Sequence, residues 1–298
     1  MPEGPEVRRC AEQLADLILG KRVFEIRAID GKLLRKHGRY LCNFAGDGPI
    51  IESVRTKGKA IFITFGDQVL ISTLGMSGWW YPKLHPAWWK DHKAYVKGKL
   101  VGVVDVVKSA LTFAKLELVV EDQVAVFTDM RNFGNINLVS HEQAKAYEAN
   151  IGLDLLSEVL DDDSLEIALE RLKRTVPAGA LIGGTLLDQA VLSGLGNIYR
   201  AETLYIARVN PFKLVKDLTD DELERIIWAA INVLNIAYHT RGTMLYPETF
   251  LSSMLSRSID KAISGHLVYG READVFGYKV VRDKSNGRTM WWVPQVQG

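Results

Sequence analysis

The stretch that decides the fold is SGLGNIYRAE at residues 193–202, which follows LLDQ at residues 186–189. Gly194 and Gly196 allow a tight turn whose backbone approaches another segment closely. Asn197 is a suitable cap for the helix that follows, and the free N–H groups at that helix start would then face outward as a phosphate site. Taken alone, the same residues also fit a plain turn between two helices that ends in a C-cap glycine.

Residues around this turn, from about 142 to 240, have the apolar spacing of helices. Two stripes carry the pattern: Leu165, Ala168, Leu169 and Leu172, then Leu223, Ile226, Ile227 and Ala230. A further helix is predicted over residues 5–20, where Pro5 suits the first turn and Gly20 suits the end.

Residues 21–138 have a different pattern, with short β-rich runs separated by Gly, Asp and Asn. Many short strands without intervening helices favour an antiparallel sandwich or barrel. The predicted strands are Ala60–Thr64, Gln68–Ser72, Leu100–Val107, Leu116–Val120 and Val124–Phe127.

The C-terminal segment returns to short strands, at His266–Tyr269, Tyr278–Val281 and Thr289–Val293. The turn at residues 284–287 contains Asn-Gly, a strong hairpin signal. We therefore expect an α+β chain with a β-sandwich domain and N-terminal helix at 1–140, a linker at 141–155, a helical domain at 156–263 and a hairpin at 264–298.

Composition excludes several classes of protein. With 47% apolar and 24% charged residues, the 298-residue chain is typical of a globular protein, and two cysteines cannot build a disulfide framework or a four-thiolate zinc site. We expect no membrane helix and no secretory signal. The use of only two cysteines fits an intracellular, reducing compartment. The net charge of +1 does not indicate nucleic acid, but the tail from Arg257 holds seven basic and four acidic residues, an excess of three.

The N-terminus contains the candidate catalytic residues. If Met1 is removed, Pro2 becomes a secondary amine, and an α-amino group has a pKa of about 7.7–8.0. Such an amine that attacks a sugar C1′ gives an iminium directly, and Glu3 would shuttle protons while Glu6 orients the ribose. Taken alone, Pro2 and Pro5 are as well explained as stiffeners of an exposed terminus, with the acids complementing a helix dipole.

Several motifs occur together, however, and in a known order. The run MPEGPEV at 1–7 resembles the start of the formamidopyrimidine-DNA glycosylase/endonuclease VIII (Fpg/Nei) family. The other matches are RTKGK at 55–59, LGMSG at 74–78, DMRNFG at 129–134, the 186–202 stretch and GRT at 287–289. The resemblance spans essentially the whole chain and implies a β-sandwich followed by a helix–two-turn–helix domain and a hairpin finger.

The resemblance also implies residue roles. Lys59 would contact phosphate and assist catalysis, and Met76, Arg131 and Phe133 would fill the hole left by an everted nucleotide, which offsets part of the cost of flipping. Asn197 and Arg288 would bind phosphates. Three positions depart from the family pattern: Thr73 replaces a His, Asn132 replaces an Arg, and Ile182-Gly183-Gly184 lacks the usual lysine.

The family usually ends in a four-cysteine zinc finger, which this chain lacks. No cysteine pair occurs in 272–281, and Val293 and Val296 stand at the last two ligand positions. We expect no metal and no other cofactor, as in the zincless-finger Nei-like branch. The hairpin core is predicted to consist of Phe276, Tyr278, Val280, Trp291 and Val293.

The expected function is a bifunctional DNA glycosylase/AP lyase of base excision repair that removes oxidised pyrimidines and hydantoins by a Pro2 Schiff base and β,δ-elimination. Its partners would be double-stranded DNA with oxidised bases or abasic sites, and also single-stranded DNA, bound by a monomer located with the DNA in the cytoplasm, nucleoid or nucleus. The alternatives are an 8-oxoguanine/formamidopyrimidine preference, a catalytically silent binder of damaged DNA, and an RNA- or ribosome-associated protein.

Overall fold

The computed structural model describes residues 2–45, 47–83, 93–96, 99–156, 162–174, 176–177 and 179–298. Contacts divide the chain into two compact units. The first contains Pro2 and Val7–Tyr147, and the second contains Glu3–Glu6 and Glu148–Gly298. The segment Glu3–Glu6 therefore packs with residues that follow it by more than 140 positions.

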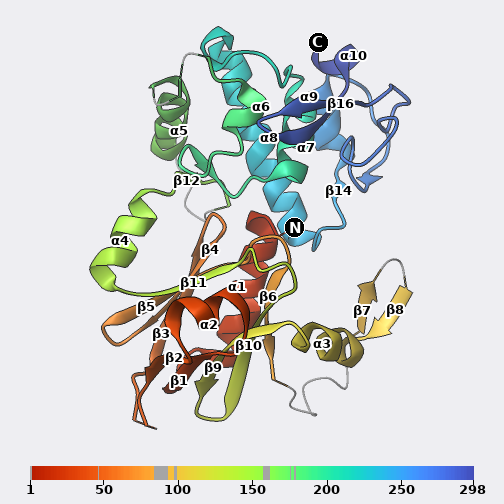
Figure 1. The fold of residues 1–298 in the computed structure, drawn as a ribbon. Helices are drawn as coiled ribbons and strands as arrows, with labels where there is room; N and C mark the ends of the chain where they lie inside the picture. The colour runs from red at the N-terminus through yellow and green to blue at the C-terminus, as the bar shows by residue number, and fades with distance from the viewer. Residues whose placement is uncertain are drawn as a thin grey trace. The chain divides into compact units, whose positions relative to one another are not determined.

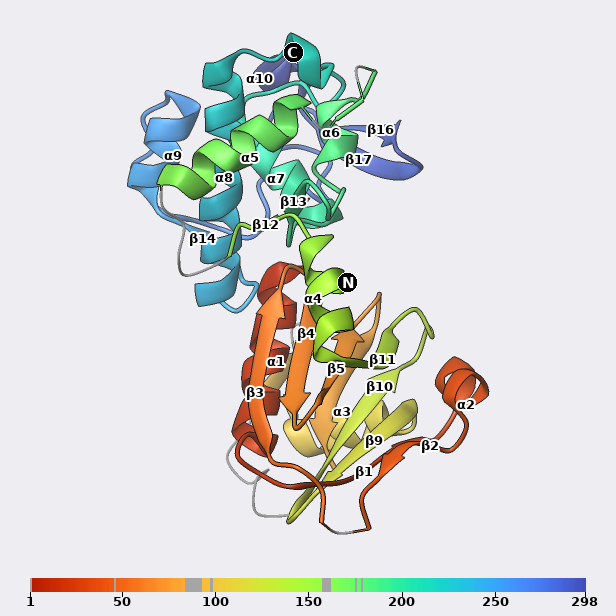
Figure 2. The ribbon, with the colours of Figure 1, turned by 90° about the vertical axis from the view of Figure 1, so that its left-hand side faces the viewer.

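The first unit contains two antiparallel sheets (Figures 1 and 2). One has the order β2 (Tyr40–Asn43), β1 (Val23–Ala28), β9 (Ala114–Val120), β10 (Gln123–Asp129), β6 (Gly78–Pro82). The other has the order β11 (Asn135–Ser140), β5 (Gln68–Thr73), β4 (Ala60–Phe65), β3 (Ile51–Lys57). Helix α2 spans Gly31–His37, and β7 (Lys93–Val96) pairs with β8 (Lys99–Gly102).

The predicted N-terminal helix is confirmed as α1 (Gly4–Ile18). Its apolar stripe is buried in the same core as residues of both sheets, among them Ile26 and Ile63. All residues of strand β4 except half-buried Thr64 are buried, because the strand lies inside its sheet and is covered on both faces. The predicted strands at 60–64, 68–72, 116–120 and 124–127 are confirmed as β4, β5, β9 and β10.

The strand predicted at Leu100–Val107 is wrong in its second half. Strand β8 ends at Gly102, and α3 (Val103–Leu111) begins at the next residue. The run of valines suggested a strand because β-branched residues favour pleated surfaces. Here packing decides instead, since Val107 is buried within the helix.

The second unit is mainly helical. It contains α5 (Asp162–Arg174), α6 (Ile182–Thr185), α7 (Asn197–Ala207), a 3-10 turn at Val215–Asp217, α8 (Asp220–His239), α9 (Glu248–Leu255) and α10 (Pro294–Gln297). Short pairs join β12 (Leu153–Asp154) to β13 (Leu192–Ser193) and β14 (Leu245–Tyr246) to β15 (Ile263–Ser264). Helix α4 (His141–Ala149) begins before the boundary between the units and ends after it.

Helix α7 is the centre of this unit. Every residue from Tyr199 to Ala207 is buried, including three polar ones, so the helix is covered on all sides. Helix α8 packs on it and begins with a capping box formed by Thr219 and Glu222. Both predicted apolar stripes are found in this core, apart from Leu165, whose side chain is outside the described residues.

The C-terminal hairpin consists of β16 (Val281–Ser285) and β17 (Arg288–Trp292). Asn286 (φ 49°) and Gly287 (φ 70°) form the turn, and two positive φ values are what a type I′ turn requires. The prediction at 289–293 is confirmed to within one residue. The strand predicted at 278–281 is displaced, because β16 begins only at Val281.

Two further predictions for this region are corrected. His266–Tyr269 is not a strand, because the N–H groups of Leu267, Val268 and Tyr269 donate to the carboxylate of Glu202 rather than to a neighbouring strand. Tyr278 is 40% exposed and does not belong to the core. Val280 and Val293 are buried as predicted, with Phe276 and Trp291 packed against them in part.

Across the described ranges, no helix is both long enough and apolar enough to span a membrane.

Candidate active site

Glu3 is fully buried and bound to the start of α7. Its carboxylate accepts hydrogen bonds from the backbone N–H groups of Gly196 (2.8 Å), Ile198 (2.9 Å) and Tyr199 (3.2 Å). An anion is stabilised there by the unpaired N–H groups and the helix dipole. A side chain at position 196 would collide with Glu3, since a Cβ there would lie 2.3 Å from the carboxylate carbon of Glu3. The residue that follows Pro2 is therefore fixed in place.

Glu6 and Gly4 complete this anchor. The carboxylate of Glu6 accepts the N–H of Glu3 at 3.0 Å and the hydroxyl of Tyr199 at 2.7 Å. The N–H of Gly4 donates to the carbonyl of Gly194 at 2.8 Å. Two glycines permit this approach, because a Cβ on Gly4 would lie 3.0 Å from the Cα of Gly194.

The prediction that Asn197 caps α7 is wrong. The cap position is Gly196, and the N–H groups that were expected to remain free are bonded to Glu3, which is a stronger acceptor than an amide. Asn197 instead donates from Nδ2 to the carbonyl of Thr289 at 3.1 Å and accepts at Oδ1 from Arg200 at 2.7 Å. It thereby joins α7 to the hairpin, next to Arg288.

The two buried charges of α7, Arg200 and Glu202, were not among the predicted site residues. Glu202 accepts the N–H groups of 267–269 and the hydroxyl of Tyr246 at 3.0 Å, which fixes the segment that leads into the hairpin. Burial, and then the neighbouring Glu202, raise the pKa of Tyr246 well above its ordinary value. A signal existed in the sequence, since Arg and Glu occur in a helix whose other residues are mostly apolar on every side.

A second group of predicted residues lies in the first unit. The buried carboxylate of Asp129 accepts the hydroxyl of Ser77 (2.6 Å) and the N–H groups of Arg131 (3.2 Å) and Gly134 (2.6 Å). A Cβ on Gly75 would lie 2.5 Å from the nitrogen of Gly134. The segments 74–78 and 129–134, which are far apart in sequence, are therefore packed together.

The paired segments 74–78 and 129–134 contain the residues predicted to fill the space left by an everted nucleotide, here called the wedge: Met76, Arg131 and Phe133. Phe133 is 57% exposed, and the guanidinium of Arg131 lies 5.3 Å from its ring centroid. Met76 is half-buried. Met130, which was not predicted, is as exposed as Phe133. Lys59 is half-buried at the turn between β3 and β4, and Pro2 is half-buried.

The structure thus brings the predicted residues together in two sets. Glu3, Glu6 and Asn197 are joined by hydrogen bonds around the start of α7, and Asn197 also bonds the backbone beside Arg288. Met76, Arg131 and Phe133 share the paired loops of the first unit, which also contains Lys59 and Pro2.

Sequence comparison bears on the same residues. Residues 1–136 match the family model described as formamidopyrimidine-DNA glycosylase N-terminal domain, and residues 151–247 match the one described as formamidopyrimidine-DNA glycosylase H2TH domain. A formamidopyrimidine-DNA glycosylase of Streptococcus pneumoniae is 30% identical over 255 residues, which cover 84% of this chain and 82% of that protein. The chain belongs to the formamidopyrimidine-DNA glycosylase family.

Solved structures agree with this formamidopyrimidine-DNA glycosylase family at the level of the fold. Lactococcus lactis formamidopyrimidine-DNA glycosylase, non-covalently bound to DNA that contains an AP site, has a TM-score of 0.71 and 22% identity, with 99% of each chain covered. A MutM protein in complex with DNA that contains carbocyclic 8-oxo-G has a TM-score of 0.70 and 23% identity, with both chains fully covered. The fold expected from the sequence is therefore confirmed.

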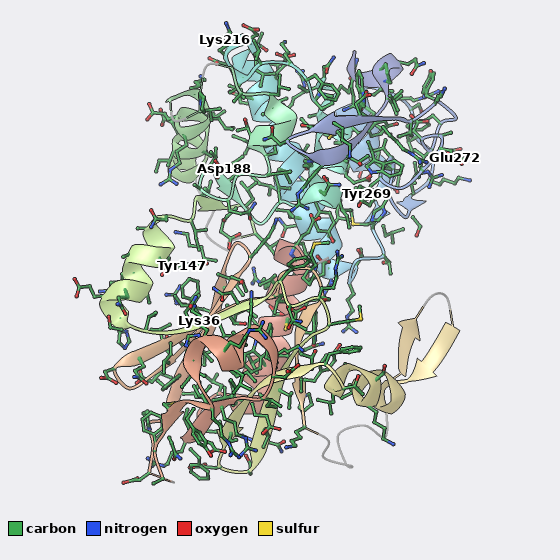
Figure 3. All side chains as sticks on the ribbon, in the orientation of Figure 1. Lys36, Tyr147, Asp188, Lys216, Tyr269 and Glu272 are labelled. Carbon is green, nitrogen blue, oxygen red and sulfur yellow. The ribbon has the colours of Figure 1, made fainter. Side chains whose placement is uncertain are left out.

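The finger of this family member is held by side chains. The carboxylate of Asp274 accepts the N–H groups of Phe276 and Tyr278, both at 2.9 Å, and the hydroxyl of Tyr205 at 2.8 Å. At the other end, Gln297 accepts the N–H of Val293 and donates to the carbonyl of Val209. Tyr269, labelled in Figure 3, packs on the ring of Trp291. In the part of the chain that the structure describes, no three His, Cys, Asp or Glu residues are grouped as metal ligands.

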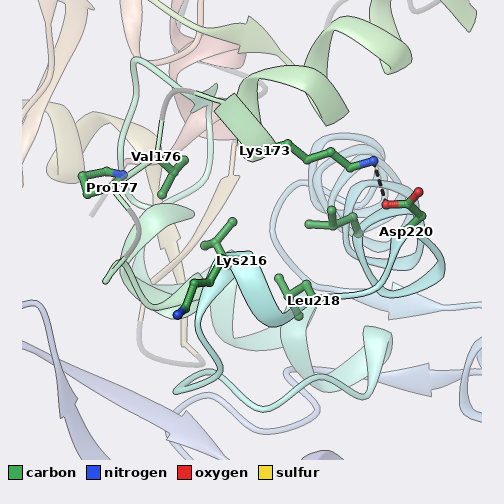
Figure 4. A pocket seen from close by; sticks show the side chains of 8 residues that line it. Lys173, Val176, Pro177, Lys216, Leu218 and Asp220 are labelled. Atoms are coloured by element: carbon green, nitrogen blue, oxygen red, sulfur yellow. Dashed lines mark ion pairs between the residues drawn. The ribbon is translucent and has the colours of Figure 1, made fainter.

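The two cysteines and a cavity next to α5 and α8 are further candidate sites. Burial raises the pKa of the Cys10 thiol to about 12 and that of Cys42 to about 11, so neither is a nucleophile near neutral pH. A cavity of about 460 Å³ next to α5 and α8 is lined by Lys173, Lys216 and Asp220 among others (Figure 4). Its Lys173 and Asp220 pair with each other at 2.6 Å, and it contains none of the predicted site residues.

Proposed function

We propose that this chain is a bifunctional DNA glycosylase/AP lyase of base excision repair, with Pro2 as nucleophile. The observation that carries the proposal is the anchoring of Glu3 by three backbone N–H groups of α7, directly after Pro2 in the chain. Fixing that residue restricts the positions that the amine of Pro2 can occupy, and such restriction is a main source of catalytic rate.

The chemistry follows from a secondary amine. The nitrogen of Pro2 forms a bond to C1′ while the bond from C1′ to the base breaks, and the base leaves with that electron pair and a proton. Opening of the sugar ring gives an iminium, which accepts electrons when C2′ loses a proton and the 3′ phosphate leaves. A second elimination expels the 5′ phosphate, and water releases the sugar fragment. Glu3 and Lys59 assist these proton transfers, and Glu6 orients the ribose.

Everting the damaged nucleotide is the other half of the proposal. Exposed Phe133, with Arg131 against it, and half-buried Met76 would fill the space that the nucleotide leaves. Asn197 and Arg288 would bind the backbone phosphates. In this scheme residues 1–140 are the catalytic domain, 156–263 the DNA-binding domain, 141–155 the linker and 264–298 a finger without zinc. The protein acts as a monomer on double-stranded DNA.

Borohydride trapping tests the nucleophile. The chain with Met1 removed should form a covalent complex with a duplex that contains an oxidised base, because borohydride reduces the iminium. The matched control is the same chain with Met1 retained, which should not be trapped, and Pro2→Gly should also lose the complex. Normal trapping and strand cleavage by the chain with a blocked amine would show that another residue is the nucleophile.

Lesion choice distinguishes two forms of the proposal. The opening PEGPE favours oxidised pyrimidines and hydantoins, whereas the name of the Streptococcus pneumoniae relative favours formamidopyrimidine, which belongs to the alternative 8-oxoguanine/formamidopyrimidine preference. Cleavage of duplexes that each contain one lesion decides between them. Binding of these duplexes without any trapping would favour the alternative of a catalytically silent binder of damaged DNA.

A further inference from the structure

Arg200 is a buried cation with neutral hydrogen-bond partners. It lies in the first turn of α7, its side chain is 0% exposed, and its guanidinium donates to the carbonyl of Gly183 at 2.5 Å and to Oδ1 of Asn197 at 2.7 Å. Within the described ranges its buried Nε has no hydrogen-bond partner. Burying a cation in this way is costly, and an apolar side chain of similar size would fill the same space at less cost. The charge and the planar fork therefore call for a role beyond packing.

A second guanidinium lies close enough to affect it. Burial, and then the charge of Arg288, lower the pKa of Arg200 to about 10, so Arg200 is still cationic at neutral pH. Two cations that repel each other are stabilised when an anion is added beside them. The carboxylate of Glu3 attracts Arg200 in part, but it is already bonded to the backbone of α7.

Arg200 also decides how the Asn197 side chain is oriented. An amide has a donor end and an acceptor end, and a guanidinium only donates. The bond from Arg200 therefore fixes Oδ1 inward, and the amino group is left to face the hairpin, where it donates to the carbonyl of Thr289. Since Thr289 follows Arg288 directly, a continuous line of hydrogen bonds runs from Arg200 to the backbone that carries Arg288.

The hydrogen bond from Arg200 to the carbonyl of Gly183 lies where the hairpin turn packs on α6. A Cβ on Gly183 would lie 3.3 Å from the hydroxyl oxygen of Ser285, and one on Gly184 would lie 2.3 Å from the amide nitrogen of Asn286. The turn of the hairpin therefore packs directly on α6 at the residue whose carbonyl Arg200 holds. One guanidinium thus fixes both supports of the hairpin, Asn197 and α6.

We propose that Arg200 is a positioning residue for phosphate binding, which orients the amide of Asn197 and, through Thr289 and Gly183, holds Arg288 against a phosphodiester of the DNA backbone. This inference rests on the proposed DNA-binding function. It assigns Arg200 a role that requires a planar fork with two donor edges, and not a positive charge alone.

The test measures binding of the full chain to a duplex with a tetrahydrofuran abasic-site analogue over a series of salt concentrations. Arg200→Met should weaken binding roughly tenfold, as expected for one lost charge-assisted hydrogen bond, and lower the slope of log K against log salt by about 1. The Tm should stay the same or rise, because an unpaired buried charge is removed. Arg200→Lys should weaken binding similarly, since a single ammonium cannot hold Gly183 and Asn197 together.

Three comparisons isolate the positioning role. Arg288→Ala and the double variant with Arg200→Met should bind equally, because Arg200 acts through Arg288. Asn197→Asp keeps the acceptor for Arg200 but loses the donor to Thr289, and should weaken binding while Arg200 itself is unchanged. Arg225→Met, which removes an arginine on α8 that pairs with Asp221, should bind within twofold of the unchanged chain.

The possible failures are distinct. If the unchanged chain does not bind the duplex, the proposed function is wrong and the inference falls with it. If the unchanged chain binds but Arg200→Met or Asn197→Asp binds within twofold of it, only the inference is wrong. Full binding by Arg200→Lys, or additive effects of Arg200→Met and Arg288→Ala, would likewise overturn positioning.

Discussion

The hydroxyl of Tyr205 donates a 2.8 Å hydrogen bond to the carboxylate of Asp274, and both side chains are buried. The same carboxylate accepts two backbone N–H groups of the loop before the hairpin, those of Phe276 and Tyr278. Three donors that converge on one anion organise a short loop much as ligands organise around a metal ion. Asp274 is therefore the residue on which the stability of the finger depends most directly.

Asp274→Ala should lower the free energy of unfolding by about 3 kcal/mol, because three buried donors lose a charged acceptor. Urea unfolding measures this change, and the exposed Asp260→Ala should alter stability by less than about 0.5 kcal/mol. Addition of a metal chelator should leave the unfolding midpoint of the unchanged chain where it is. A midpoint that falls with the chelator would contradict a finger held by Asp274.

Gly196→Ala should remove the anchor of Glu3 while leaving the backbone unstrained, since Gly196 has φ −125°. The added Cβ would lie 2.3 Å from the carboxylate carbon of Glu3, so the carboxylate must move away from the α7 N–H groups. We expect borohydride trapping to fall at least tenfold, which corresponds to about 1.4 kcal/mol of barrier. Gly179→Ala is the control, because a Cβ there meets nothing within 4 Å. Equal trapping by both variants would show that the anchor has no catalytic role.

Phe133→Ala should separate stability from lesion recognition. The side chain is 57% exposed, so its loss should change the free energy of unfolding by less than about 0.5 kcal/mol. Excision should fall roughly tenfold, since the stacking contribution of one aromatic side chain to an opened base stack is about 1–3 kcal/mol. Tyr40→Ala, at 43% exposure in the same unit, should leave excision unchanged. Unchanged excision by Phe133→Ala would remove this residue from the wedge.

Alkaline pH should destabilise the second unit through two buried tyrosines. Burial, and then the hydrogen bond to Asp274, raises the pKa of Tyr205. Burial, and then the charge of Glu202, raises the pKa of Tyr246. The native chain therefore keeps two protons that the unfolded chain releases above about pH 10. The stabilisation is complete below that pH and is lost as the pH rises, by about 1.4 kcal/mol per pH unit for each tyrosine. Tyr246→Phe should make the decline less steep between pH 10 and 12. An unchanged slope in that variant would contradict the burial of a neutral phenol.

Local signals in the sequence were sufficient for elements stabilised by nearby residues. The helix α1 follows from its apolar spacing, and the hairpin turn follows from Asn286-Gly287, whose positive φ values need no distant partner. The paired loops around Asp129 were found only because their motifs resemble a family.

Two of the errors share a cause, which is a partner far away in the sequence. The N–H groups at the start of α7 bind Glu3, 194 positions before Asn197, and not the side chain of Asn197. The N–H groups in 266–269 bind Glu202, about 65 positions earlier, and not a neighbouring strand. No window of local sequence contains both members of such a pair. Buried Arg200 and Glu202 were signalled only by two charges in an otherwise apolar helix.

The anchoring of Glu3 also orders events during synthesis. The N–H groups that bind Glu3 belong to residues 196–199, which are synthesised after it. At about 5–20 residues per second, the interval is about 10 to 40 s. In the proposed mechanism, a nascent or prematurely terminated chain that lacks α7 has Pro2 without the support that directs it, so strand cleavage would have to wait until the second unit is made.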